Sequence, residues 1–128
     1  MPASTAVVNA GRAILTNRII GSGTEPKNVA MGTGTTAVAL TDTTLGGEVE
    51  SRTAGTSSRT TTSTTNDTYQ VTGTVTATAS RTIGEAGLFD AASGGNLFVR
   101  GVLASTISLA SGDSIAFTFT VQVTSAVV

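Results

Sequence analysis

The chain has 128 residues, a net charge of −1 and 12 % charged residues, and it contains neither cysteine nor histidine. This length fits one domain with a buried core. The composition excludes a disulfide framework and thiolate chemistry, and it removes the commonest general base and the commonest zinc ligand. No nucleic-acid partner is expected, because the six arginines and one lysine are scattered rather than gathered in a basic patch.

Threonine dominates the composition with 26 residues, and glycine adds 15. Threonine is β-branched and favours strands, so the composition predicts a β-rich structural protein with broad, weakly charged contact surfaces. A disordered Thr-rich linker is disfavoured because several runs alternate with hydrophobic residues. No run approaches the ~20 apolar residues of a membrane span, and residues 1–5 lack the features of a signal peptide. We therefore expect no membrane partner and no export.

The N-terminal part predicts an arm over residues 1–8, followed by a single β-rich domain over residues 9–128. Asn9–Ile20 is the helical candidate of this domain, since four of its residues fall at helical spacing: Ile14, Leu15, Arg18 and Ile19. Asn9 suits the N-cap and Gly21 the C-terminal end of such a helix. Ile19 and Ile20 are β-branched, so a strand remains the alternative.

The middle of the chain predicts short strands separated by turns. Asn28–Met31 and a longer strand starting within Leu45–Glu50 are candidates, and Ala37–Leu40 is a short apolar run. Residues 52–65 contain few hydrophobic residues and allow two interpretations, an exposed Thr-rich edge strand or a mobile loop. We favour a strand from about Ser58 to Thr65, ended by a turn at Asn66-Asp67.

Two segments alternate cleanly between apolar and polar residues, which is typical of half-buried strands. In Thr68–Ala79 one face carries Tyr69, Val71, Gly73, Val75 and Ala77. In Ser114–Thr124 one face carries Ile115, Phe117, Phe119, Val121 and Val123, which predicts a central core strand. Together with a short strand at Thr106–Leu109 and a turn at residues 111–113, this spacing predicts an all-β fold, a single antiparallel β-sandwich or barrel.

A β-hairpin is predicted over Thr82–Ala104, with its loop at Asp90–Gly95. The register that pairs like with like sets Leu88 opposite Leu97, Ala86 opposite Val99 and Glu85 opposite Arg100. Phe89 and Phe98 then share the second face with the Glu85–Arg100 pair. We interpret this pair as an exposed cross-strand ion pair, which would contribute less than ~1 kcal/mol, with an interface role as the alternative.

The motifs that suggest chemistry are weak. Gly32–Ala37 resembles a dinucleotide-binding glycine loop, but no helix and no suitably spaced acidic residue follow it, so a turn is favoured. Glu48, Glu50 and Arg52 would share a strand face, where a salt-bridge row is favoured over a cation site. Lys27 alone could serve a serine–lysine hydrolase, which is disfavoured. We predict no catalytic, cofactor-binding or metal-binding residues and no cofactor.

Several short motifs appear in an order that resembles small virion proteins of tailed bacteriophages, over about residues 12–122. They are Ile14–Arg18, Gly23–Lys27, Met31–Gly34, Asp42–Leu45, Thr65–Val71, Glu85–Asp90, Gly95–Phe98 and Gly112–Ile115. Such proteins are head decoration (cement) proteins or tail- and fibre-associated structural proteins. The resemblance implies a β-rich protomer that works in many copies, and it carries over no catalytic residues.

From this resemblance we expect a non-enzymatic protein that decorates and stabilises the capsid as a homo-oligomer, in the trimeric form common to decoration proteins. Its partners would be the major capsid protein and itself, and its location the capsid surface of the virion, after synthesis in the bacterial cytoplasm. The alternative is a tail or tail-fibre structural protein that contacts a receptor. The absence of histidine and cysteine disfavours an enzyme.

Overall fold

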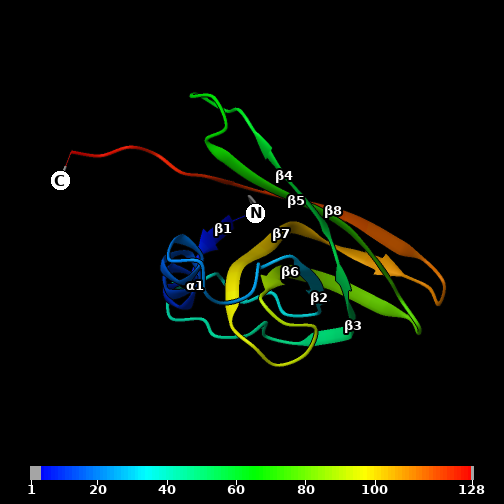
Figure 1. Cartoon of the computed structure of the whole chain (residues 1–128). Coiled ribbons are helices and arrows are strands. Elements are labelled where there is room, and N and C mark those ends of the chain that lie inside the picture. The colour runs from blue at the N-terminus through cyan, green and yellow to red at the C-terminus, as the bar shows by residue number, and fades with distance from the viewer. Residues whose placement is uncertain (1–3, 128) are drawn as a thin grey trace.

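Two antiparallel sheets stack into a β-sandwich in the computed structural model, which describes residues 4–127 (Figure 1). This confirms the all-β prediction. The larger sheet has the order β1 (Ser4–Val7), β7 (Leu97–Leu109), β6 (Arg81–Phe89), β2 (Asn28–Gly32) and β3 (Glu48–Ala54). The smaller sheet has the order β4 (Thr56–Thr60), β5 (Thr68–Thr76) and β8 (Ser114–Gln122). The helix α1 (Asn9–Ile19) lies at one end of the sandwich.

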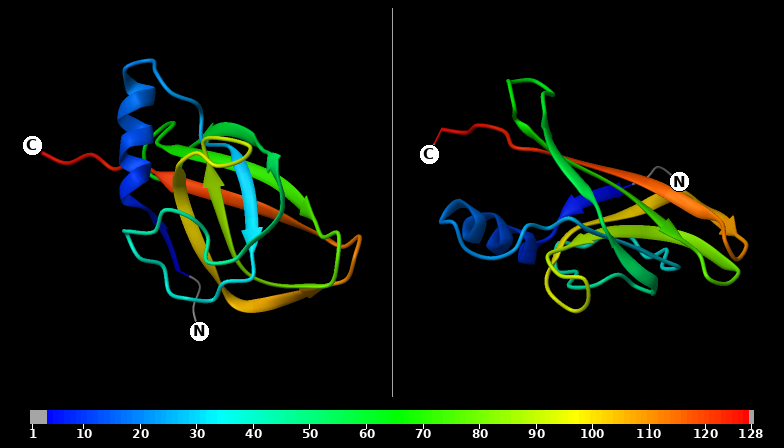
Figure 2. Two further views of the ribbon diagram at one scale, coloured as in Figure 1. Left: turned by 90° about the horizontal axis from the view of Figure 1, so that it is seen from below. Right: turned by 45° about the vertical axis from the view of Figure 1, so that its right-hand side comes forward.

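The larger sheet carries buried apolar residues on both faces. Its inner face packs on the smaller sheet around a core that includes Val29, Met31, Val71, Val75, Leu88, Phe98, Phe117 and Phe119. Its other face carries a smaller apolar cluster of Val8, Ala30, Leu45, Phe89 and Leu97. Irregular loops cover this second face, and the right-hand view of Figure 2 shows them on the side opposite the smaller sheet. The longest of them, residues 33–47, has no helix or strand.

The helix predicted at Asn9–Ile20 is confirmed, but its N-terminal cap is not Asn9. Val8 occupies the N-cap position without a side-chain hydrogen bond, and the Asn9 N–H donates to the Leu40 carbonyl at 2.8 Å. The C-terminal end is as predicted, since Gly21 adopts a φ of +79° there. In the described part of the chain, no helix is long and apolar enough to cross a membrane.

The expected N-terminal arm is, in its described part, the strand β1. It pairs antiparallel with β7, with Ser4 opposite Val102 and Val7 opposite Val99. Residues 1–3 of the arm lie outside the described residues.

Most predicted strands form, with shifted bounds. Ala37–Leu40 stays a loop. The strand β3 starts at Glu48, within the predicted range, because Gly46 and Gly47 before it donate their N–H groups to a side chain instead of a strand. The Thr-rich edge strand is confirmed as β4 but ends at Thr60 rather than Thr65. Beyond it, the carboxylate of Asp67 accepts the N–H groups of residues 62–64 and so forms the turn.

The strand β8 has the predicted faces but not the predicted position. Phe117 and Phe119 point into the core, each 8 % exposed, while Thr118 and Thr120 are exposed. The strand is an edge of the smaller sheet, and the central strand is β5. Alternation identifies the buried face of a strand but not its place in the sheet, which is why the sequence placed β8 wrongly.

The β6–β7 hairpin is confirmed, and its predicted register is wrong. Leu88 lies opposite Val99 rather than Leu97, Ala86 opposite Gly101 rather than Val99, and Glu85 opposite Val102 rather than Arg100. The pairing nearest the loop, Phe89 with Leu97, is displaced by one residue from the prediction, and a bulge at Phe98 adds a second. The bulge also separates the two phenylalanines, which were predicted to share a face: Phe98 packs between the sheets and Phe89 on the outer cluster.

Replacing Phe117 by aspartate tests the inward assignment of β8. Removing the ring costs about 3–5 kcal/mol, and the buried carboxylate that replaces it has no counterion. We expect Phe117→Asp to lose cooperative thermal unfolding, as followed by circular dichroism. The control Thr118→Asp changes the neighbouring exposed residue and should still melt cooperatively. A cooperatively melting Phe117→Asp protein would contradict the assignment.

Candidate functional site

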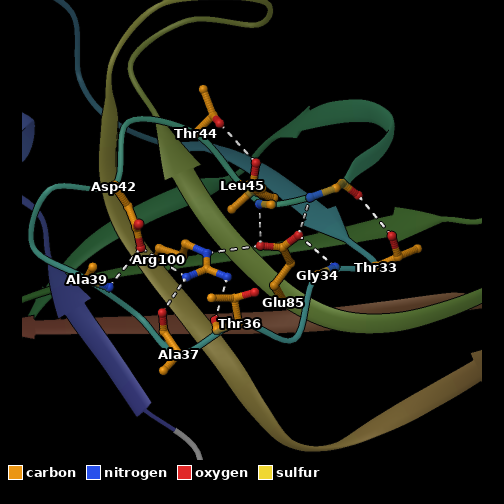
Figure 3. Close-up of polar contacts among 12 residues, drawn as sticks. Thr33, Gly34, Thr36, Ala37, Ala39, Asp42, Thr44, Leu45, Glu85 and Arg100 are labelled. Atoms are coloured by element: carbon orange, nitrogen blue, oxygen red, sulfur yellow. Dashed lines mark hydrogen bonds and ion pairs between the residues drawn. The ribbon is translucent and has the colours of Figure 1, made fainter.

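The carboxylate of Glu85 is the polar centre of the structure. Glu85 lies on β6, points to the outer face of the larger sheet and is 0 % exposed. Its Oε2 accepts the N–H groups of Gly34 at 2.8 Å and Gly47 at 2.7 Å (Figure 3). Its Oε1 accepts the Gly46 N–H at 2.8 Å and the Arg100 Nε–H at 3.0 Å. Four donors therefore compensate the buried charge.

Two of the glycines around this carboxylate leave no room for a side chain. A Cβ at Gly34 would collide with the Glu85 carboxylate, and a Cβ at Gly32 would lie 2.5 Å from its Oε2. Gly32 is the last residue of β2, and residues 33–37 begin the irregular loop in place of the favoured turn. One of its N–H groups, that of Gly34, donates to an anion, as in a phosphate-binding loop, but the anion is the protein's own carboxylate. The glycine spacing that resembled a dinucleotide-binding motif is thus explained by internal packing.

Arg100 on β7 extends the network to the middle of the same loop. Its guanidinium donates to the Asp42 carboxylate at 3.0 Å and to the Thr36 carbonyl at 2.9 Å. The Asp42 carboxylate also accepts the Ala39 N–H at 2.9 Å. Glu85 thus holds the two ends of residues 33–47 and Arg100 holds their centre, as Figure 3 shows.

The predicted contact between Glu85 and Arg100 is therefore present, but its predicted environment is wrong. We expected an exposed pair, whereas Arg100 is 2 % exposed and Glu85 is fully buried. The two residues also meet diagonally, because Gly87 is the residue directly opposite Arg100. The pair is buried because the loop of residues 33–47, far earlier in the chain, covers it.

Two opposing effects set the pKa of Glu85. Burial is the largest single influence and raises the pKa, because it disfavours the charged form. The N–H donors of Gly46 and Gly47, the Arg100 guanidinium and the Gly34 N–H together outweigh it and lower the pKa below its ordinary value. Glu85 is therefore held as a carboxylate, which is the form that its donors require.

The row expected from Glu48, Glu50 and Arg52 is broken at its centre. Arg52 pairs with Glu48 at 2.8 Å and lies over the Phe89 ring, with its guanidinium carbon 3.5 Å from the ring centroid. Glu50 has a φ of 66°, which turns it away from the other two residues. It accepts the Thr78 N–H and hydroxyl and the Arg81 Nε–H, which together lower the pKa of Glu50 to about 2. The two carboxylates thus form no joint site.

The remaining candidates for chemistry also have structural partners. Lys27 lies 3.9 Å from the Glu25 carboxylate, and the Tyr69 hydroxyl donates to the same carboxylate at 3.1 Å. Burial raises the pKa of Tyr69. Within residues 4–127, no group of three or more acidic, histidine or cysteine side chains is placed to hold a metal ion. The charged side chains described here orient loops and turns.

Contact surfaces are more prominent than chemical sites. The outward side of the smaller sheet, which we call the hydroxyl face, carries short uncharged side chains on all three strands. Its members are Thr56, Ser58, Thr60, Gln70, Thr72, Thr74, Thr76, Ser114, Ala116, Thr118, Thr120 and Gln122. The sequence predicted the alternation within β5 and within β8, but not that register would join the polar sides into one face. The matching Thr-rich alternation of the two segments was the available signal.

An apolar groove of about 260 Å³ lies between α1 and the end of β8. Its lining includes Ile14, Leu15, Tyr69, Phe98, Val121 and Val123, with Arg18 and Glu25 as its charged residues. Exposed apolar side chains continue from it along the helix, since Ile19 is 81 % exposed. This groove was not predicted from the sequence, because its lining residues come from four separate elements.

The chain was compared with models of known protein families, and a family model matches most of it. The model of the family described as "Podophage GP4 fiber I protein gp80" matches residues 13–124 of the chain. No curated protein and no solved structure shows significant similarity to it.

Replacing Glu85 by glutamine tests the role of its carboxylate. The glutamine amide would set N–H groups against the N–H donors of the glycines and leave Arg100 without its buried counterion. We expect the free energy of unfolding, measured with urea, to fall by about 3–5 kcal/mol. Glu48→Gln is the control, since Glu48 is partly exposed and its removal should cost less than about 1 kcal/mol. Equal losses in the two variants would contradict the proposed role.

The same network predicts how stability depends on pH. Folding lowers the pKa of Glu85, so its contribution is complete above the ordinary glutamate pKa of about 4.3 and is lost as the pH falls through the folded-state value. Glu50 acts in the same direction. We expect urea denaturation to show a falling free energy of unfolding below about pH 4.3. Glu85→Gln should show a smaller fall, and an identical pH dependence would contradict this.

Proposed function

Since this chain belongs to the podophage fiber I protein family, we propose that it is a structural subunit of a virion fibre. The family match covers most of the chain and identifies a bacteriophage structural protein. It supports the tail-fibre alternative over capsid decoration, which the sequence analysis placed first. The match to residues 13–124 is the single observation that carries the proposal.

The surface supports a role built on contacts between subunits. A fibre repeats its subunits, so each copy must expose areas that neighbours can cover without burying unpaired charges. The hydroxyl face meets this requirement, since none of its side chains is charged. Hydroxyl and amide groups both donate and accept hydrogen bonds, so they can pair with many neighbours.

The buried Glu85–Arg100 network supports the same proposal from inside the protein. A repeated subunit must present identical surfaces in every copy. The loop of residues 33–47 has no secondary structure, yet six of the hydrogen bonds described above hold its backbone and its Asp42 side chain in place. The charged groups thus fix shape, and we propose that the chain acts by assembly rather than by catalysis.

Capsid decoration, with the major capsid protein as partner and a homotrimer as the assembled form, is the competing proposal. The two proposals differ in where the chain lies in the virion, and microscopy of the particle distinguishes them.

The test compares particles of the encoding phage with particles from a nonsense mutant of this gene. We expect cryo-electron microscopy to show fibres missing or shortened in the mutant and an unchanged capsid lattice. Gold-labelled antibodies raised against the purified chain should mark the fibres of normal particles, and a complementing gene should restore them. Labelled capsid faces, or mutant heads that lack surface density while the fibres stay intact, would establish decoration instead.

A further inference from the structure

The four edge strands of the two sheets differ in how they are protected from pairing with another strand. Natural edges are kept apart by short length, charged residues, proline or bulges. The strand β1 has four described residues, β3 carries three charged residues and a register shift in its pairing with β2, and β4 has five residues including Arg59. The strand β8 has nine residues, no charge, no proline and an unbroken register with β5.

The segment after β8 lengthens this unprotected edge. Figure 1 shows it continuing in the line of β8, away from the body of the protein. The Val123 N–H donates to the Asp67 carbonyl at 2.8 Å, and beyond it no described strand lies beside the segment. Its apolar side chains are exposed, Val123 by 63 % and Val127 fully. Residues 114–127 thus form one extended, uncharged segment.

A crevice of about 250 Å³ opens along the same edge. It is bordered by Thr5 on β1, by residues 101–103 on β7 and by residues 117–120 on β8. Inward side chains of β8 (Phe117, Phe119) and outward ones (Thr118, Thr120) both line it, so it opens at the edge of the strand. A strand added beside β8 would therefore also cover the part of the core that remains exposed there.

We propose that residues 114–126 pair antiparallel with the same segment of a second copy, around a two-fold axis at Thr120. This register places Ser114 of one copy opposite Ala126 of the second copy, so it uses the whole of β8 and the extended segment after it. The two smaller sheets become one continuous six-stranded sheet.

The side chains of the segment complement themselves in this register. On the outward side, Thr120 meets its own counterpart, Thr118 meets Gln122 and Ala116 meets Thr124. On the inward side, Phe119 meets Val121 and Phe117 meets Val123, which covers the exposed valine. In these pairs apolar residues meet on the inward side and small or polar residues meet on the outward side; the exception in this register is Ile115, which lies opposite Ser125. An isologous contact sets each residue near its own symmetry mate, so charges would repel, and this segment carries none.

The inference deepens the proposed function and rests on it in one respect, since a fibre brings many copies together. The strand pairing and the fibre assignment can each fail without the other. A chain that labels the fibre but never pairs through β8 would overturn the strand pairing and keep the fibre assignment, whereas a β8-paired chain found on the capsid would do the reverse. A two-fold contact joins copies in pairs, so the predicted trimer would need a different contact.

Single cysteines test the register directly, because the chain has no cysteine of its own. Directly opposite residues in an antiparallel pair have Cβ atoms about 4.5–5.5 Å apart, close to the separation in a disulfide. We expect Thr120→Cys to form disulfide-linked dimers of the full chain under mild oxidation. Thr72→Cys, on β5 of the same face, is the matched control. Three strand spacings of about 4.8 Å each would separate the two copies of Thr72 in the dimer, which is too far for a disulfide.

A mixture of Ala116→Cys and Thr124→Cys should link as a heterodimer, while each variant alone stays unlinked. Linking of Thr120→Cys no stronger than that of Thr72→Cys would overturn the proposal, as would linking of Ala116→Cys to itself.

A charge at the axis tests the contact without oxidation. Thr120→Lys would place two lysines opposite each other, and we expect sedimentation to show a dimer affinity at least ~10-fold weaker than that of the unaltered chain. Thr72→Lys should leave the dimer affinity unchanged, and circular dichroism should show both exposed-site variants folded. Two outcomes would overturn the proposal. One is that the unaltered chain sediments as a single copy at the crosslinking concentration, and the other is that the two variants have equal dimer affinity.

Discussion

The buried carboxylate of Glu85 is the constraint on which much of the structure depends. A carboxylate without solvent is costly unless hydrogen bonds and a counterion compensate it, and here three glycine N–H groups and Arg100 do so. Meeting that requirement brings residues 33–47 onto the outer face of the larger sheet. The loop in turn covers apolar residues such as Phe89 and Leu97, which would otherwise face water. One charge thus positions a loop, and the loop completes the second core.

Local pattern predicted the elements well because it acts over a few residues. The alternation in β5 and β8 correctly predicted Val71, Val75, Phe117 and Phe119 as inward residues. The hairpin register failed because the pairing nearest the loop is displaced by one residue and a bulge at Phe98 adds a second. One extra residue in one strand leaves no mark in the alternation of the other. The edge position of β8 failed for a related reason, since strand order is set by pairing between segments far apart in the sequence.

The site could be predicted only in part. The sequence brought Glu85 and Arg100 together, but nothing near either residue indicated their burial, which comes from the distant loop of residues 33–47. The available signal was the glycine spacing, Gly32 and Gly34 followed by Gly46 and Gly47. A side chain at Gly32 or Gly34 would collide with the Glu85 carboxylate, and the N–H groups of Gly46 and Gly47 donate to it. Glu50 was misplaced because its φ of 66° breaks the face that alternation assigned to it. Features that depend on distant segments or on unusual backbone geometry were the ones missed.

The distribution of charge links the interior to assembly. The chain has few charged residues, and many of them fix loops and turns. The hydroxyl face on the outward side of the smaller sheet is therefore left with hydroxyl and amide groups. Copies of such a surface do not repel each other electrostatically, which favours association. The lack of charged side chains also removes a common protection of sheets against uncontrolled pairing. Specificity must then come from geometry. Three of the four edges retain charge or short length, so strand addition is directed to a single edge, and a protein with one open edge forms defined contacts rather than an unlimited sheet.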